Sequence, residues 1–174
     1  MIKFLRVLGR DALRYDNKLT RHLILRLLVH SPGFWAVILI RLMQACHEIR
    51  IPIVRHIMVF LIRKRMIANY GLDIGPGCKI GPGLKMDHPV GIVIGSGVVI
   101  EENATILSGC VIGEKYIDSR ASGIYPTVGS HVFIGANTII LGEVAIGANV
   151  EIGAGSIVLA SIPSNSKVNG LIKK

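Results

Sequence analysis

The stretch Thr127–Val158 reads TVGSHVFIGANTIILGEVAIGANVEIGAGSIV. Within it an aliphatic residue recurs at every sixth position: Val128, Ile134, Ile140, Ile146, Ile152 and Val158. A period of six fits neither an amphipathic helix nor a simple alternating strand. Fixed short repeats of this kind are typical of a parallel β-helix. Each hexapeptide would supply one short strand, with the aliphatic side chain inside the coil, and one tight corner that suits Gly or Asn.

The same period begins earlier in the chain, with two interruptions. It runs through Ile74, Ile80 and Met86, and after a two-residue slip through Ile94, Ile100, Ile106 and Ile112. The slip lies around Asp87-His88-Pro89. The second interruption, residues 113–127, is too long for a corner and is rich in charged and flexible residues, so we expect an ejected loop, a common place for function. We therefore expect a mainly β protein with a coil over residues 71–162 and a C-terminal tail over 163–174.

Residues 1–70 predict a short α-helical domain. Apolar residues at helical spacings predict helices over about 3–29, 34–48 and 52–69. The breaks fall at Ser31-Pro32-Gly33 and Ile51-Pro52. This segment holds 13 basic residues against three acidic ones, whereas residues 71–174 hold seven against eight. The basic charge of the chain, +9 overall, therefore belongs to the helical segment alone.

The basic residues lie among Leu, Ile, Val and Met, which favours a membrane surface or a partner protein over nucleic acid. A solvated helix face with its apolar side in a subunit interface is an equal alternative. We see no signal peptide, and the longest uncharged run, residues 27–40, is shorter than the ~20 residues of a spanning helix. We expect a cytoplasmic chain that rests on the inner face of the membrane through residues 1–70.

Three cysteines, Cys46, Cys78 and Cys110, are widely spaced and form no CxxC pair. We therefore expect neither a disulfide framework nor a zinc site, and no metal requirement. Among the six histidines, His88 is the candidate general base, because it follows Asp87 at the register slip. A structural role for His88 is as well supported by spacing alone.

Two segments carry a family resemblance. Residues 73–88, DIGPGCKIGPGLKMDH, followed by GIVIG at 91–95, resemble the signature of the serine O-acetyltransferases, within the hexapeptide-repeat acyltransferases. The similarity extends over residues 71–162. It implies a left-handed parallel β-helix, a homotrimer with active sites between subunits, and acetyl-CoA as the donor. A hexamer built through the helical segment stays open.

The resemblance also assigns roles. His88 would be the general base and Asp73 the carboxylate that orients it, a pairing that fixes the imidazole tautomer. Asp87 would contact the acceptor's amino group, and a backbone N–H at Gly113 or Glu114 would stabilise the oxyanion. The CoA arm would lie along small residues that are equally well explained as tight corners: Gly135, Ala136, Gly153 and Ala154.

One departure from the family concerns the acceptor. Where the family has an Arg-His pair that holds the amino acid, this chain has Ile124-Tyr125. Arg120 is a candidate substitute, and the ring of Tyr125 suits a sugar face. With its short basic helical segment, the chain resembles the capsule and exopolysaccharide O-acetyltransferases. We therefore expect acetylation of a saccharide hydroxyl, with serine acetylation and a non-catalytic scaffold as alternatives.

Overall fold

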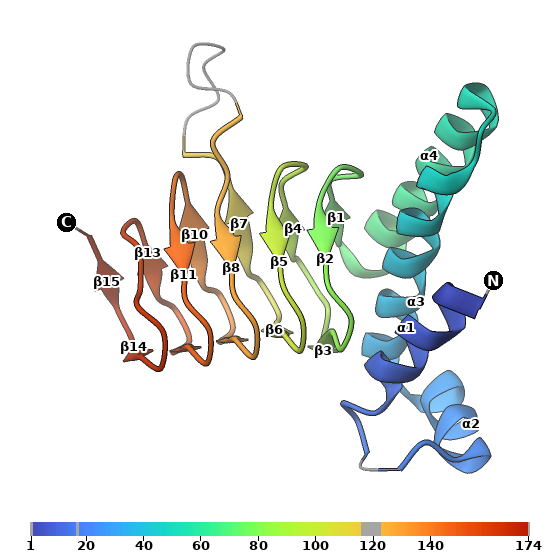
Figure 1. Cartoon of the computed structure of the whole chain (residues 1–174), viewed down its shortest axis with the longest axis horizontal. Coiled ribbons are helices and arrows are strands. Elements are labelled where there is room, and N and C mark those ends of the chain that lie inside the picture. The colour runs from blue at the N-terminus through green and yellow to red at the C-terminus, as the bar shows by residue number, and fades with distance from the viewer. Residues whose placement is uncertain (1, 17, 116–122, 174) are drawn as a thin grey trace.

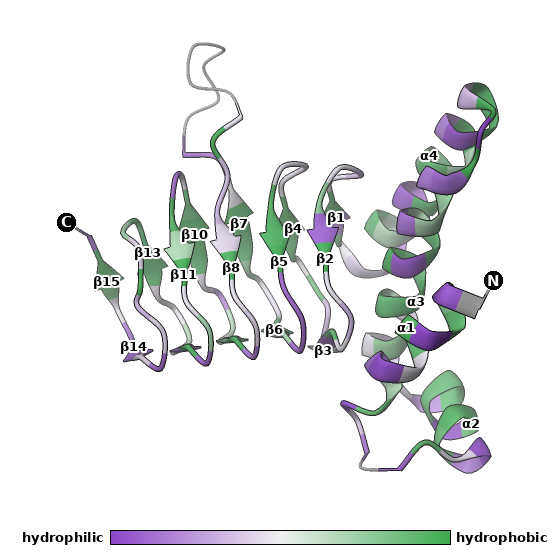
Figure 2. Ribbon diagram, in the orientation of Figure 1, coloured by the Kyte–Doolittle hydropathy of each residue, from purple (hydrophilic) through white to green (hydrophobic). Residues whose placement is uncertain are grey.

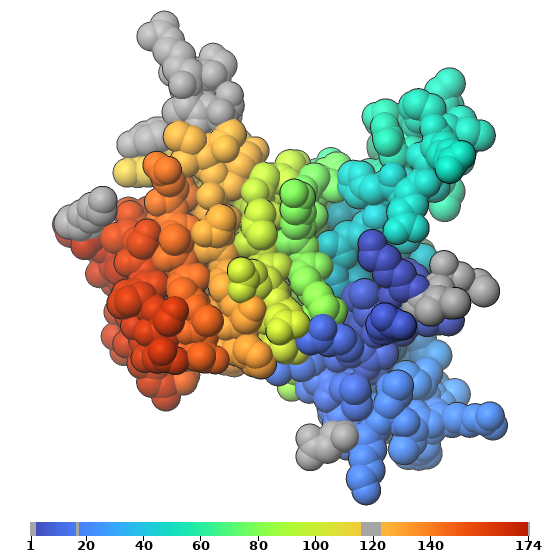
Figure 3. Space-filling model, viewed as in Figure 1, coloured from blue at the N-terminus to red at the C-terminus, as the bar shows by residue number. Residues whose placement is uncertain are grey.

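The structure, a computed structural model, describes residues 2–16, 18–115 and 123–173. A helical head is followed by a long three-sided prism of short strands (Figure 1). The helices are α1 (Ile2–Ala12), α2 (Arg21–His30), α3 (Pro32–Ala45), a short 3-10 helix η1 (Cys46–Glu48) and α4 (Pro52–Tyr70). α3 and α4 cover the first coil of the prism, and α4 projects beyond it (Figure 3).

The helical segment has one more break than the sequence predicts. We expected one helix over residues 3–29, but α1 ends at Ala12 and α2 begins at Arg21. The hydroxyl of Thr20 caps α2 by accepting from the Leu23 N–H at 3.0 Å. Ser31 caps α3 in the same way, with Pro32 in the first turn, where a missing N–H costs nothing.

The prism consists of three parallel sheets. Sheet A contains β1 (Asp73–Ile74), β4 (Val93–Ile94), β7 (Val111–Gly113), β10 (Ile139–Leu141), β13 (Ile157–Val158) and β15 (Leu171–Ile172). Sheet B contains β2 (Lys79–Ile80), β5 (Val99–Ile100), β8 (Thr127–Val128) and β11 (Ala145–Ile146). Sheet C contains β3 (Lys85–Asp87), β6 (Thr105–Leu107), β9 (Phe133–Ile134), β12 (Glu151–Ile152) and β14 (Lys167–Val168).

The aliphatic residues of the six-residue period line the inside of this prism. Ile74, Ile106, Ile134, Ile140 and Ile152 are all fully buried. In Figure 2 most of the strands are green, whereas the corners that connect them are largely white or purple. The predicted parallel β-helix with a short N-terminal helical domain is confirmed.

The coil continues beyond the end that the period predicts. We expected residues 163–174 to be a tail, but β14 pairs with β12 and β15 pairs with β13. The repeat is harder to detect there, because the inward residues Ile162, Val168 and Ile172 follow Val158 at spacings of four, six and four. Val168 and Ile172 are only partly buried, at the open end of the prism.

A buried ion pair joins the helices to the first coil. Arg41 donates through Nε and Nη2 to the two carboxylate oxygens of Asp11, at 2.8 and 2.9 Å. Arg41 also donates to the carbonyls of Ile80 and Gly81, both at 2.7 Å. The Asp11 carboxylate accepts in turn from the backbone N–H of Gly83, at 2.7 Å. Arg41 and Asp11 therefore bind each other, and each also binds the backbone of a turn in the first coil.

Within the described residues, no single helix meets the length and hydropathy expected of a membrane span. One bent pair of segments meets these criteria when its two parts are taken together, by length and composition only. The parts are Arg21–His30 and Pro32–Glu48, with a bend of 97° between them.

We predict that Asp11→Asn lowers the free energy of unfolding by about 3–5 kcal/mol, because it leaves the buried Arg41 charge uncompensated. Urea unfolding followed by circular dichroism measures the change. Glu102→Gln is the matched control, since Glu102 pairs with Arg10 at the surface and its loss should cost about 1 kcal/mol or less. Equal losses in the free energy of unfolding for the two variants would contradict the conclusion that the buried pair of Asp11 and Arg41 holds the helices on the first coil.

Candidate active site

The corner between sheets C and A carries two inserted residues in the first coil. β3 and β6 stay in register through Asp87, and β4 and β7 pair again from Val93. The inserted residues are His88 and Pro89, because the Val90 carbonyl is again bonded to the next coil at 2.8 Å. The slip seen in the sequence is therefore a bulge at this edge of the prism.

The bulge exposes His88. Its side chain is solvent-accessible and its backbone φ is 55°, in the left-handed region that few residues other than glycine adopt. The repeating left-handed residues of this edge, such as Gly109 and Asn137, occupy a different position, aligned with Gly91. An unusual backbone conformation that presents a titratable side chain supports a functional role.

Asp73 lies near this corner without contacting His88. β1 begins at Asp73 and pairs with β4, the strand that follows the bulge. The Asp73 carboxylate, however, accepts from Nη2 of Arg63 on α4 at 2.5 Å. Within the described residues, Asp73 and His88 share no hydrogen bond, so the predicted pair is not formed in the isolated subunit. Arg63 of α4 is the partner that the Asp73 carboxylate has instead.

Asp87 lies beside His88 and points out of the coil. In β3 only the middle residue, Met86, is buried, so Lys85 and Asp87 face outward together. Lys85 Nζ lies 3.1 Å from the Asp87 carboxylate and 5.5 Å from the centre of the Tyr15 ring. The Asp87 carboxylate beside His88 is therefore partly exposed and forms an ion pair with Lys85.

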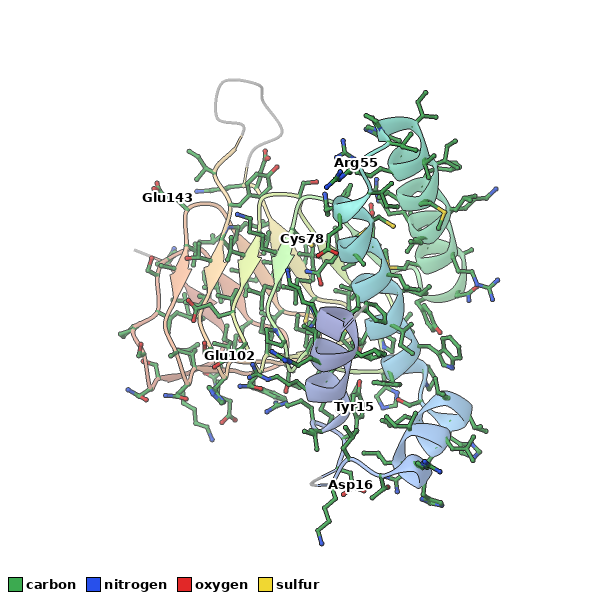
Figure 4. All side chains as sticks on the ribbon, turned by 45° about the vertical axis from the view of Figure 1, so that its right-hand side comes forward. Tyr15, Asp16, Arg55, Cys78, Glu102 and Glu143 are labelled. Atoms are coloured by element: carbon green, nitrogen blue, oxygen red, sulfur yellow. The ribbon has the colours of Figure 1, made fainter. Side chains whose placement is uncertain are left out.

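His88 and Asp87 form one wall of a pocket of about 470 Å³, and the helical head forms the other. The head contributes Arg26 and His30 from α2, together with Tyr15, which Figure 4 shows below α1. The head packs closely here, since a Cβ on Gly33 would lie 1.8 Å from the Met86 carbonyl oxygen. The pocket is therefore defined by backbone contact between α3 and β3.

Tyr15 fixes this contact. Its hydroxyl donates to the Met86 carbonyl at 3.1 Å and accepts from the Met86 N–H at 3.2 Å. Burial raises the pKa of the Tyr15 hydroxyl well above its ordinary value, so the group stays protonated at physiological pH. Tyr15 is therefore a neutral hydrogen-bonding anchor between the head and β3.

The small residues predicted for the donor lie on the same edge as His88. Gly135 and Ala136 follow β9, and Gly153 and Ala154 follow β12, so all four occupy the corner from sheet C to sheet A. The corners are stacked closely, since a Cβ on Gly135 would lie 2.5 Å from the Ala154 nitrogen. A file of small residues thus runs along one edge of the prism away from His88.

Three further predicted residues, Gly113, Glu114 and Tyr125, lie on another edge. Gly113 ends β7 and Glu114 begins the loop to β8, at the corner from sheet A to sheet B. The ring of Tyr125 covers Gly97, where a Cβ would meet it at 1.9 Å. A hydrogen bond to the Glu114 side chain raises the pKa of Tyr125. The structure therefore separates Gly113, Glu114 and Tyr125 from His88 within one subunit.

Arg120, predicted as an acceptor contact, lies outside the described residues. Sequence reasoning missed Tyr15, Arg26 and His30, which precede the coil by many positions. The one available signal was His30 at the helix break before Ser31-Pro32-Gly33, which places it at an end of α2. In the described part of the chain, no group of three or more His, Cys, Asp or Glu side chains is arranged to hold a metal ion.

Comparison with known proteins agrees with this architecture. Residues 125–160 match the family model of the bacterial transferase hexapeptide (six repeats). The chain is 36% identical over 141 residues to serine acetyltransferase of Helicobacter pylori (strain ATCC 700392 / 26695), covering 80% of this chain and 78% of that protein. It is 39% identical over 116 residues to chloroplastic serine acetyltransferase 1 of Arabidopsis thaliana, covering 67% of this chain and 36% of the relative. A serine acetyltransferase solved in complex with CoA superimposes with a TM-score of 0.80 at 28% identity, over 97% of this chain and 68% of that one.

The fold is thus the left-handed parallel β-helix of the hexapeptide-repeat acyltransferases. Within that class, the chain belongs to the serine acetyltransferase family. It spans 36% and 58% of the lengths of two of its curated relatives, from Arabidopsis thaliana and Synechococcus elongatus (strain ATCC 33912 / PCC 7942 / FACHB-805).

Our prediction of a saccharide acceptor, and with it a place in polysaccharide synthesis, is wrong. The relatives and the solved structures are serine acetyltransferases. The prediction depended on Ile124-Tyr125 in place of an Arg-His pair. Tyr125 instead packs on the backbone at Gly97 and forms a hydrogen bond with the Glu114 side chain. Its ring therefore lies where the loop leaves the coil, and it does not line the pocket beside His88.

Proposed function

We propose that this chain transfers an acetyl group from acetyl-CoA to the hydroxyl of free serine. The observation that carries the proposal is an exposed His88 on an inserted corner, at the head of a file of small residues and beside the carboxylate of Asp87. Membership of the serine acetyltransferase family supports the choice of acceptor.

In the proposed reaction, His88 acts as the general base. Its neutral imidazole takes the serine hydroxyl proton while the oxygen attacks the thioester carbonyl carbon. The carbon–oxygen bond forms, and the negative charge moves to the carbonyl oxygen, where a backbone N–H can stabilise it. The carbon–sulfur bond then breaks, and the imidazolium returns the proton to the CoA sulfur. The products are O-acetylserine and CoA.

We propose that the site is completed by a second subunit, in a homotrimer. His88 and the small residues lie on the edge between sheets C and A, whereas Gly113 and Glu114 lie on the edge between sheets A and B. A C–A edge facing a neighbour's A–B edge would bring the base and the oxyanion donor together. In such a closed ring every subunit offers both edges, as cyclic symmetry requires.

His88→Asn should lower kcat/KM for serine by about 10²–10⁴-fold, because it removes the base. Asparagine tolerates a positive φ, so the corner keeps its backbone. The control is His131→Asn, at an exposed corner residue with a φ of 59° on another edge. The measurement is acetyl-CoA turnover with serine, followed by thiol release. No turnover of serine by the wild-type chain, or full activity of His88→Asn, would refute the proposed function.

We also propose that the chain is cytoplasmic and that α4 contacts an anionic membrane surface. The outward face of α4 exposes large apolar side chains, including Ile53, Ile57 and Phe60, at 72%, 53% and 64%. The same helix carries Lys64 and Arg65 and has no acidic residue. Apolar residues flanked by cations suit the interface of an anionic bilayer. The three cysteines are free, in keeping with a reducing compartment.

Wild-type chain should sediment with vesicles containing phosphatidylglycerol about tenfold more than with neutral phosphatidylcholine vesicles, and less so at high salt. Ile57→Ser with Phe60→Ser should abolish the binding and leave serine turnover unchanged. Phe133→Ser, on the coil, is the matched control. Equal binding to both lipids would refute the proposal. A smaller assembly with unchanged lipid binding would show instead that a second copy covers α4.

A further inference from the structure

The pocket beside His88 contains a cation that the proposed reaction has not yet used. Arg26 on α2 lines it together with Asp87 and His88. His30, one helical turn further along α2, lines it too. Residues four apart share one face of a helix, so Arg26 and His30 point the same way. Two basic groups from the head therefore face one carboxylate and one imidazole from the coil.

We propose that Arg26, assisted by His30, binds the carboxylate of the amino-acid acceptor. The inference rests on the proposed function and adds the residues that select the substrate. Serine offers a carboxylate, an ammonium group and a hydroxyl. The pocket offers a guanidinium, a carboxylate at Asp87 and the base His88. Each substrate group therefore has a partner of complementary charge or hydrogen-bonding character.

Arg26 is free to accept this role. It contacts Asp16 through a single nitrogen, Nη2, at 3.2 Å, and its side chain is 50% exposed. A guanidinium has five N–H donors in a planar fork, so one such contact leaves donors for a second carboxylate. The exposed ion pair with Asp16 is weak and easily exchanged.

The helix that carries Arg26 is held firmly. Leu23 and Leu27 of α2 are buried with Phe34 and Ala12 in a core of the head. The Thr20 cap fixes the start of α2. The backbone of Arg26 is thereby positioned against the coil, while its side chain can adjust to a ligand.

The assignment also accounts for the departure at Ile124-Tyr125. The Tyr125 ring is committed to Gly97 and its hydroxyl to Glu114, so this position offers no cation to a carboxylate. Arg26 supplies that charge from the helical head instead. The head would then bind the acceptor as well as cover the coil.

The test is the kinetics of Arg26→Gln with serine and with serinamide, which lacks the carboxylate. We expect KM for serine to rise about 10- to 100-fold, the loss of one charge-assisted hydrogen-bonded pair, with kcat changed less than about threefold. KM for serinamide and for acetyl-CoA should stay constant, so the preference for serine over serinamide disappears. Arg21→Gln, at an exposed arginine of the same helix outside the pocket, is the matched control and should behave as wild type.

An unchanged serine-to-serinamide preference in Arg26→Gln, with wild-type serine turnover intact, would overturn this inference and leave the proposed function standing. Failure of the wild-type chain to acetylate serine would overturn the proposed function itself. Thermal melts verify that Arg26→Gln is folded. His30→Gln should raise KM for serine in the same direction by a smaller factor, and an effect confined to kcat would contradict its place at the carboxylate.

Discussion

The buried ion pair between Asp11 and Arg41 joins the helical head to the first coil, and the pocket beside His88 lies between these two parts. Arg41 belongs to α3 and Asp11 to α1, and both also bond to backbone of the first coil. Charges so deeply buried are tolerable only when every lone pair and proton finds a partner, and here the coil's own turns supply them. The pair therefore sets one arrangement of head on prism. The pocket between α2 and β3 exists because that arrangement is fixed.

From this arrangement the chemistry follows the geometry of one edge. Two residues, His88 and Pro89, are inserted into one corner of the first coil. The insertion exposes His88, while the corners below it remain small at Ala136 and Ala154. The same edge can therefore hold a base at one end and an extended thioester donor along its length. The helical head contributes the guanidinium of Arg26 to the pocket at the His88 end of this edge.

Much of the coil could be predicted from the sequence, because a six-residue period constrains strand, corner and core together. The slip at His88 was visible for the same reason: a regular repeat makes an insertion conspicuous. The pocket could not be predicted, because Arg26 and His88 come to line one pocket only through the packing of separate elements. The substitution at Ile124-Tyr125 misled us about the acceptor, since a lost cation at one position says nothing about a cation supplied from another segment.

The most direct test of the account is a crystal structure of the chain with CoA and serine bound. We predict that the pantetheine lies along the edge past Ala154 and Ala136, with its sulfur and the serine hydroxyl both beside His88. The serine carboxylate should contact Arg26, and a neighbouring subunit should close the site. CoA bound along a different edge, or a His88 ring with no access to the thioester, would contradict the account.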